Sequence, residues 1–183
     1  MSRVGIFLAD GFEEIEGLTV VDILRRAGID ISMISINGKK KVTGAHGIAL
    51  DTDEDIVQCD PDKLDMLVLP GGMPGTTNLA ACEKLTEALK KADQEKRGIA
   101  AICAAPSVLG DLGFLKGKKA VCYPGFESRL TGAEVLAVPV VTDGHITTSR
   151  GMGTAIAFAL ELTKRRKDEE TVKQVGRSIL YNV

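Results

Sequence analysis

Cys103 is the residue of this sequence best placed for nucleophilic chemistry. It follows the short apolar run 99–102 and precedes Ala104, Ala105 and Pro106. The run predicts a buried strand, and Pro106 is typical of the first turn of a helix. We therefore expect Cys103 at a sharp turn between a strand and a helix, a nucleophile elbow that exposes the thiol and directs helix N–H groups toward it. A buried structural cysteine is the alternative that the local sequence leaves open.

Glu16 is the candidate proton partner of this cysteine. It belongs to the acidic stretch 10–16, together with Glu13 and Glu14. Negative charge on Glu13 and Glu14 suits a helix N-terminus. Glu16 lies one turn further along, on the side shared with Phe12 and Val20, which predicts that it points inward. A buried carboxyl has a raised pKa, and when protonated it donates a hydrogen bond to a thiolate or an oxidised sulfur.

Gly71 and Gly72 follow another buried apolar run, 64–69. Paired glycines let backbone N–H groups approach a ligand and form an anion-binding nest, although a plain tight turn explains an isolated pair equally well. The stretch lacks the lysine and hydroxyl residue of a phosphate-binding loop, and the chain has no dinucleotide fingerprint. No cofactor is therefore expected.

Three further side chains are candidates for lining the site. Tyr123 ends an expected strand, His46 lies in an expected hairpin loop, and Arg150 stands between Ser149 and Gly151. Each has an ordinary alternative as a partly buried or solvated residue, and His145 is expected to be an exposed turn residue. Because no cysteine or histidine pair has the spacing of metal ligands, no metal site is predicted.

Apolar runs and turn signals set the expected elements around these residues. The predicted strands are 4–8, 29–36, 64–69, 99–102, 119–122, 135–141 and 145–148, with Pro139 indicating an edge position for 135–141. The predicted helices are 12–27, 76–96 with a break near Cys82, 106–112, 154–166 and 169–178, and 126–131 is expected as a helical turn. A small hairpin is expected over 41–43 and 47–50, an acidic loop over 51–55, and a capping box from Asp10 to Glu13.

Alternating strands and helices predict an α/β fold with a mostly parallel, doubly wound sheet. Ligands of such folds bind at the carboxyl ends of the strands. Four polar or glycine-rich stretches follow strand ends, namely 10–16, 70–75, 103–106 and 148–153. We expect the topology to bring them into one site.

Composition narrows the class of protein. The chain has 183 residues, 44% of them hydrophobic and 26% charged, with a net charge of −2 and no Trp. These values are typical of a globular protein and exclude disordered and membrane-spanning classes, and the charge gives no basis for a specific nucleic-acid or membrane partner. We expect a single domain over 1–183 with four free thiols. The short apolar run near the N-terminus is not a signal peptide, so a cytoplasmic location is expected.

Taken together, the motifs resemble those of the ThiJ/PfpI superfamily, and most closely its DJ-one branch. The resemblance rests on 10–16, Leu69–Gly72, 101–106 and 148–151, in matching order along almost the whole chain. It implies a flavodoxin-like three-layer sandwich, a homodimer and an easily oxidised Cys103. It also implies that Glu16 is the protonated carboxyl partner, with backbone N–H groups of Gly71, Gly72 and Ala104 forming an oxyanion site.

The resemblance implies a function in carbonyl and oxidative stress. Relatives are assigned cofactor-independent glyoxalase activity, removal of methylglyoxal or glyoxal adducts from proteins, and chaperone roles, so the expected partner is a small aldehyde or a glycated protein. Ala104 stands where protease-like members carry a histidine, which argues against a peptidase. Tyr123 and His46 stand where other relatives carry histidine and arginine. The alternative is a redox sensor or chaperone in which an accessible Cys103 of low pKa is oxidised to the sulfinate.

Overall fold

A seven-stranded sheet organises the computed structural model, which describes residues 3–181. Its strand order is β10-β11-β7-β6-β1-β2-β5, and every neighbouring pair is parallel except β10 with β11. The strands of this sheet are β1 (Arg3–Leu8), β2 (Asp30–Ser35), β5 (Glu54–Asp55), β6 (Met66–Leu69), β7 (Gly98–Ile102), β10 (Val140–Asp143) and β11 (Ile146–Ser149).

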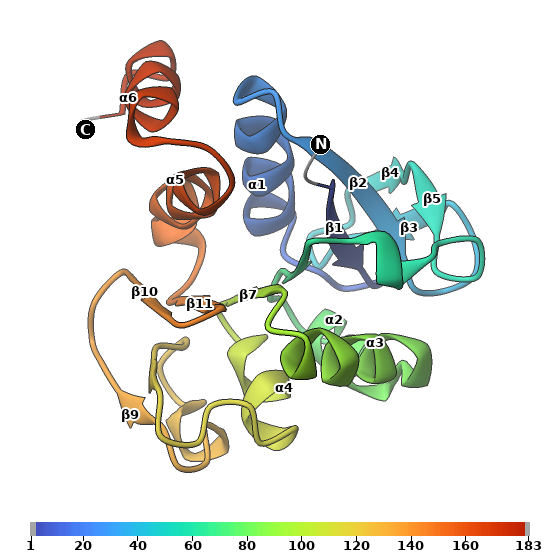
Figure 1. Ribbon diagram of the computed structural model, residues 1–183. Helices are drawn as coiled ribbons and strands as arrows, with labels where there is room; N and C mark the ends of the chain where they lie inside the picture. The colour runs from blue at the N-terminus through green and yellow to red at the C-terminus, as the bar shows by residue number, and fades with distance from the viewer. Residues whose placement is uncertain (1–2, 182–183) are drawn as a thin grey trace.

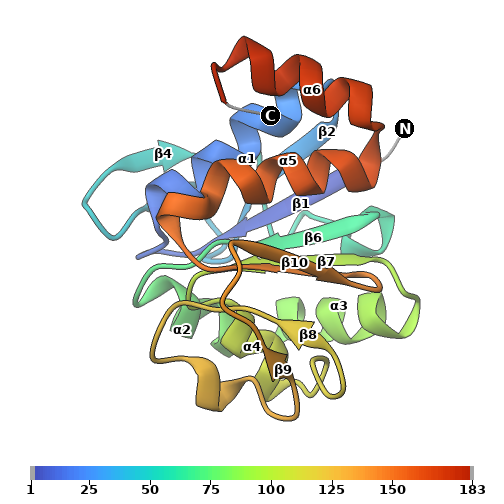
Figure 2. The ribbon, with the colours of Figure 1, turned by 90° about the vertical axis from the view of Figure 1, so that its left-hand side faces the viewer.

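Helices cover both faces of the sheet and form a three-layer sandwich of the flavodoxin-like type (Figures 1 and 2). One face carries α1 (Glu14–Arg26), α5 (Ala155–Arg166) and, beyond it, α6 (Glu169–Ser178). The other carries α2 (Gly75–Ala81), α3 (Glu83–Gln94) and α4 (Pro106–Asp111). Short 3₁₀ turns are η1 (Pro61–Lys63), η2 (Glu127–Arg129) and η3 (Met152–Thr154). The predicted fold class is confirmed, as is the break between α2 and α3 at Cys82.

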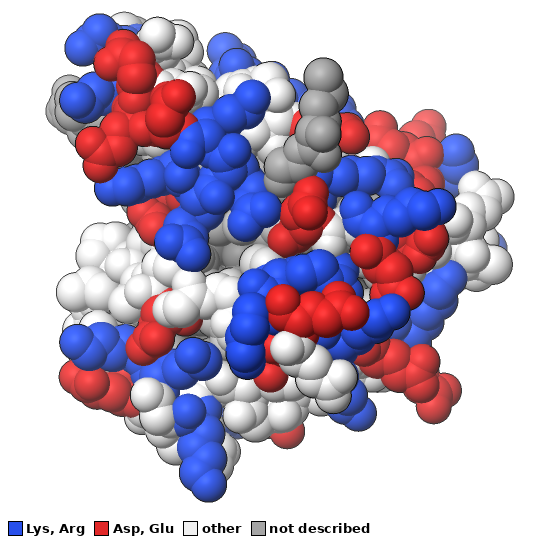
Figure 3. Space-filling view, viewed as in Figure 1, with Lys and Arg blue, Asp and Glu red and all other residues white. Residues whose placement is uncertain are grey.

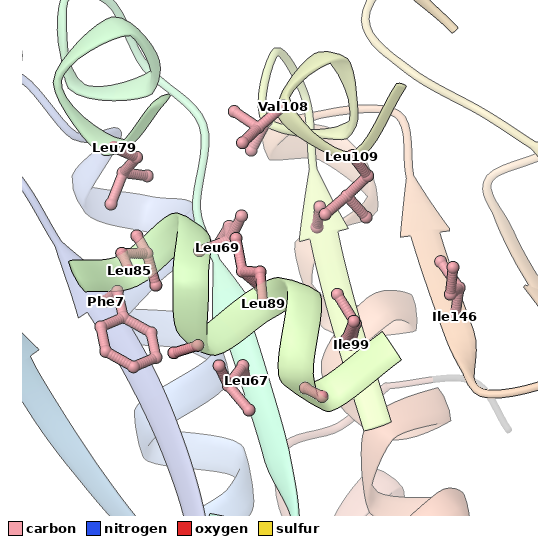
Figure 4. Close-up of a cluster of buried hydrophobic side chains, with 14 of the residues drawn as sticks. Phe7, Leu67, Leu69, Leu79, Leu85, Leu89, Ile99, Val108, Leu109 and Ile146 are labelled. Carbon is pink, nitrogen blue, oxygen red and sulfur yellow. The ribbon is translucent and has the colours of Figure 1, made fainter. Parts of the chain in front are cut away.

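The side chains of each strand alternate between the two faces of the sheet, so the sheet contributes to two hydrophobic cores. Successive side chains of a strand point to opposite faces, so Phe7 and Leu67 pack toward α3, whereas Ile6 and Val68 lie in the cluster on the α1 and α5 side. Figure 4 shows the first cluster, with Leu85 and Leu89 of α3 beside the strand residues. Because both faces are covered, the central strands are apolar throughout, as buried parallel strands are.

Two small sheets lie outside the main one. The hairpin β3 (Lys41–Thr43) with β4 (Ala49–Asp51) confirms the predicted hairpin. The predicted strand 119–122 is shorter, because β8 (Lys119–Ala120) pairs only with β9 (Glu134–Val135). The predicted strand 135–141 is wrong as a single element. Pro139 has no N–H for a ladder, and it separates β9 from β10, which does lie at the sheet edge.

Three other expectations near the sheet need correction. The acidic segment 51–55 is not a loop throughout, because β5 pairs with β2. The first helix begins at Glu14, and no capping box forms from Asp10 to Glu13, because the Asp10 carboxylate accepts from the N–H of Thr43 at 2.8 Å. The expectation that His145 is an exposed turn residue is wrong. Only 9% of its side chain is exposed, and its Nε2 lies 2.7 Å from Asp93 Oδ1.

The face of the molecule shown in Figure 3 carries charges of both signs. Basic and acidic side chains are mixed over the face shown in Figure 3, in keeping with the net charge of −2. Within residues 3–181, no helix is long and apolar enough to cross a bilayer.

Candidate active site

The predicted convergence at the carboxyl ends of the strands is confirmed. Strands β11, β7, β6 and β1 are consecutive neighbours in the sheet and run parallel, so the segments that follow them meet at one edge. A methyl group placed on Gly71 would lie 2.5 Å from Cys103 Cβ and 2.7 Å from Glu16 Oε2. Residues from three separate segments of the chain therefore form one compact site.

Cys103 occupies the sharp turn between β7 and α4. Its φ of 67° lies in the left-handed region, which non-glycine residues adopt at a cost of about 1–3 kcal/mol. Two backbone hydrogen bonds hold this conformation: the Cys103 N–H donates to Ser149 O at 3.0 Å, and the Cys103 carbonyl accepts from the Tyr123 N–H at 2.8 Å. The half-buried cysteine is thus held at the elbow that the sequence predicted.

Glu16 points inward from the first turn of α1 and is 1% exposed. Its carboxyl group is hydrogen-bonded to the Cys103 thiol, and its Oε2 accepts from the Gly71 N–H at 2.9 Å. Burial raises the pKa of Glu16 to about 7, although the bonds to Cys103 and Gly71 oppose the rise and the charge of Glu13 adds to it. The prediction of an inward carboxyl with a raised pKa is confirmed.

The Cys103 thiol does not have the low pKa that was expected. Burial, the Glu16 charge and the hydrogen bond to Glu16 raise its pKa to about 12, while backbone N–H groups of Ala104 and Gly72 oppose the rise. Two negative charges side by side repel each other strongly in a desolvated site. The pair therefore keeps at least one proton through the neutral range, and a thiolate forms when a single remaining proton resides on Glu16.

The glycine turn after β6 fits tightly around this pair. Gly72 has a φ of 89°, and a methyl group there would lie 2.3 Å from the Glu13 N atom, so only glycine fits this turn. The Gly71 N–H is already donated to Glu16 and is not a free donor for a substrate oxygen. The donors that face the sulfur are the N–H groups of Gly72 and Ala104.

His46 binds Glu14 and makes no hydrogen bond to Cys103 or Glu16. Its Nδ1 lies 2.9 Å from Glu14 Oε2, and its N–H donates to Glu14 Oε1 at 2.8 Å. Glu14 lies in the first turn of α1, where the sequence predicted a negative charge, but it is 3% exposed and also bonds the hairpin loop. Burial acts to raise its pKa, but the hydrogen bonds from His46 and Ile48 leave it lowered overall.

The carboxylates of Glu13 and Glu14 and the His46 ring offer potential metal-ligand atoms within 4.8 Å of one another. Sequence spacing did not indicate this group, because the hairpin brings His46 to α1 from a distant part of the chain. Ion pairs join its members, from His46 Nδ1 to Glu14 Oε2 at 2.9 Å and to Glu13 Oε2 at 3.5 Å.

Tyr123 and Arg150 lie at a cleft of about 370 Å³ beside the Cys103–Glu16 pair. The cleft is also bordered by Pro139, Gly151 and Thr154. A methyl group on Gly151 would lie 3.2 Å from the Tyr123 ring and 3.9 Å from Glu16 Oε1, so Gly151 separates the cleft from the pair. The sequence analysis did not identify Pro139 as a residue that borders this cleft. The available signal was that a proline interrupts the strand predicted over 135–141.

The other cysteines have different surroundings. All four are free thiols, as predicted. Cys59 and Cys122 are buried, and burial raises the pKa of each to about 11. Cys82 is half-buried at the break between α2 and α3. None of the three is hydrogen-bonded to a carboxyl side chain within residues 3–181, which distinguishes Cys103.

Comparisons with known proteins agree with the fold. Residues 2–165 match the model of the DJ-1/PfpI family. Protein dj-1beta of Drosophila melanogaster is 36% identical over 97% of both chains, and a deglycase of Pyrococcus abyssi is 33% identical over 90% of this chain and 99% of its own. The DJ-1 homolog B of Arabidopsis thaliana is 37% identical over 95% of this chain but only 40% of its own, so this chain spans less than half of that relative.

Solved structures give the same result. The oxidised DJ-1 of Toxoplasma gondii superposes with a TM-score of 0.96 at 33% identity, with all of both chains covered. The family model covers most of this chain, and the relatives align along nearly its full length. The chain therefore belongs to the DJ-1/PfpI family.

Proposed function

We propose that this protein acts in carbonyl stress, using Cys103 and Glu16 to convert methylglyoxal, glyoxal or their adducts into 2-hydroxy acids. The observation that carries the proposal is the hydrogen-bonded, desolvated pair of Glu16 and Cys103 at a strained elbow. A nucleophile next to a group that accepts and returns its proton is the arrangement that covalent catalysis needs. The deglycase name of the Pyrococcus abyssi relative supports the same reaction class.

The first step is addition of sulfur to the aldehyde. The thiol proton passes to Glu16, a C–S bond forms at the aldehyde carbon, and the carbonyl electron pair moves to oxygen. The Gly72 and Ala104 N–H groups that face the sulfur are placed to stabilise this oxyanion. Glu16 then returns the proton to oxygen and leaves a hemithioacetal. With an adduct on an amine, the C–N bond breaks and the amine departs with the proton instead.

The second step moves a proton between the two carbons. The Glu16 carboxylate removes the hydrogen on the carbon bound to sulfur and delivers it to the neighbouring carbonyl carbon, while the hydroxyl proton of the first carbon moves to the oxygen of the second, which gives a thioester of a 2-hydroxy acid. Water hydrolyses the thioester, so methylglyoxal plus water yields lactate and the thiol is restored. A carboxyl pKa near 7 suits a group that must both accept and donate a proton.

Lactate production from methylglyoxal tests the proposal. Wild-type protein is expected to form lactate, whereas Cys103→Ala and Glu16→Gln should each lower kcat by at least ~100-fold. Cys82→Ser is the matched control, because Cys82 is also half-buried but lies away from the site. Equal lactate formation by wild type and Cys103→Ala would refute the proposal.

Oxidation of Cys103 is a second candidate function, favoured by the same polar surroundings. Glu16 and the N–H groups of Gly72 and Ala104 would hydrogen-bond the oxygens of a sulfinate. Two peroxide molecules convert the thiolate to a sulfinate with release of two waters. Mass spectrometry after mild peroxide should show two added oxygens on Cys103, with Cys59, Cys82 and Cys122 spared. Uniform oxidation of all four would reject a sensor role.

We also propose a homodimer formed through the exposed face of α1. Ile15 and Ile48 are 51% and 54% exposed, and together with Leu18 and Ile156 they border a shallow apolar groove. A second copy offers the same apolar surface, as a two-fold interface requires. Light scattering should report a dimer for wild type and a monomer for Ile15→Lys, and a monomeric wild type would contradict the assignment.

A further inference from the structure

The cleft beside the Cys103–Glu16 pair contains a single charged group. Its described lining residues include Tyr123, Pro139, Gly151 and Thr154, which are neutral, and Arg150 is the only charged one. No carboxylate within residues 3–181 lies within 4.0 Å of the Arg150 guanidinium, in contrast to the many arginines of this chain that are paired. An unpaired guanidinium in a neutral cleft is a recognition element for an anion.

The backbone that carries Arg150 is held by a compact set of hydrogen bonds. The Arg150 N–H donates to Pro139 O at 3.3 Å, and the Ser149 hydroxyl donates to the same oxygen at 2.9 Å. The Gly151 N–H donates to Thr154 Oγ1 at 3.1 Å, and the Thr154 N–H donates back to Gly151 O at 2.8 Å. Because this backbone is fixed before a ligand arrives, little ordering cost is left for binding.

Gly151 is the residue that separates the cleft from the reacting groups. Gly151 lies between the Tyr123 ring and Glu16 Oε1, and the Tyr123 N–H donates to the Cys103 carbonyl. With no side chain on Gly151, one small molecule can place a carbonyl carbon at Cys103 and a second group in the cleft. A side chain at this position would lie between the two.

We propose that this cleft is an anion subsite in which Arg150 binds the carboxylate of a 2-oxoaldehyde or of its adduct. The preferred substrate class is thus an aldehyde, or an aldehyde adduct of a small molecule, that carries a free carboxylate. A single guanidinium forms two parallel hydrogen bonds to a carboxylate and matches its single charge, whereas a phosphate dianion would keep one charge uncompensated in this cleft. This substrate preference rests on the proposed function, whereas the anion subsite itself does not.

A matched pair of substrates tests the preference. The probes are 4,5-dioxopentanoate, which carries a carboxylate, and its neutral methyl ester. Wild type should favour the acid over the ester by ~10-fold in kcat/KM, mainly through KM, because a charge-assisted hydrogen bond contributes about that factor. Arg150→Gln should abolish the preference and Arg150→Lys should retain part of it. Arg177→Gln, at an exposed position of α6, should behave as wild type. An acid-to-ester ratio that is the same in Arg150→Gln and wild type would overturn the proposal.

Alkylation of Cys103 tests the subsite without turnover. Iodoacetate and iodoacetamide differ in charge but little in size, and mass spectrometry reports their rates at Cys103. The iodoacetate-to-iodoacetamide rate ratio should fall several-fold in Arg150→Gln and stay at the wild-type value in Arg177→Gln. An unchanged ratio in Arg150→Gln would refute the anion subsite. If wild type converts neither dioxopentanoate probe, the proposed function fails, and the alkylation ratio alone then decides whether the subsite exists.

Discussion

The carboxyl group of Glu16 is hydrogen-bonded to the thiol of Cys103, and the two groups together keep at least one proton in a desolvated site through the neutral pH range. Glu16 comes from the first turn of α1 and Cys103 from the elbow after β7, so the sheet brings together residues that are far apart in the chain. The pKa of each group is raised by burial. The reactivity of each residue therefore depends on the other.

Glu16 should make the protein less stable as the pH rises. Its pKa in the folded state is about 7, against 4.5 as the reference value, so the folded state binds more protons between these values. The free energy of unfolding should therefore fall from pH 4.5 to pH 7, by up to about 3 kcal/mol for this group. Urea unfolding at several pH values, compared between wild type and Glu16→Gln, measures it. A pH-independent difference between the two proteins would contradict the raised pKa.

Removing the charge of Glu16 should make the Cys103 thiolate easier to form. The Glu16 charge and hydrogen bond are two of the three causes that raise the thiol pKa. In Glu16→Gln, the midpoint of the pH profile for Cys103 alkylation should shift to lower pH, even though turnover is lost. Glu87→Gln, on the exposed side of α3, is the control. A midpoint that stays the same or rises in Glu16→Gln would show that the carboxyl does not govern the thiol.

Gly71→Ala should damage both the stability and the site. The added methyl group would lie 2.5 Å from Cys103 Cβ and 3.0 Å from the Ile102 carbonyl oxygen, so the backbone must shift. We expect a loss of about 1–3 kcal/mol in the free energy of unfolding, together with loss of Cys103 reactivity. Gly153→Ala is the matched control for stability, because a methyl group there meets no atom within 4 Å. Equal unfolding free energies for the two variants would contradict the tight packing at Gly71.

Glu14→Gln should loosen the hairpin loop that rests on α1. The buried Glu14 carboxylate accepts from the N–H groups of His46 and Ile48. Its pKa is lowered, so this contribution to stability is present above pH 4.5 and is lost as the pH falls through the folded-state pKa. Hydrogen exchange of the His46 and Ile48 amides should be faster in Glu14→Gln. Unchanged exchange of both amides would show that Glu14 does not hold the loop.

Most of the fold was predictable because its signals are local. The apolar run before Cys103 and Pro106 after it predicted the elbow, and the parallel strand pattern predicted that residues 10–16 and 70–75 would meet it. Errors arose where a distant segment decides the outcome: His145 bonds Asp93, and β5, within the segment expected as a loop, pairs with β2. A local pattern contains no information about such a partner.

The sequence by itself determined the order of the elements, the position of Cys103 at a turn and the inward side of Glu16, because helix and strand periods act over a few residues. The tertiary structure alone decided that the Gly71 N–H is used by Glu16 and that Arg150 shares a cleft with Tyr123. It also decided that the thiol pKa is raised and not lowered. Burial and the distance between charges set these properties, and both are fixed only when segments distant in sequence pack together.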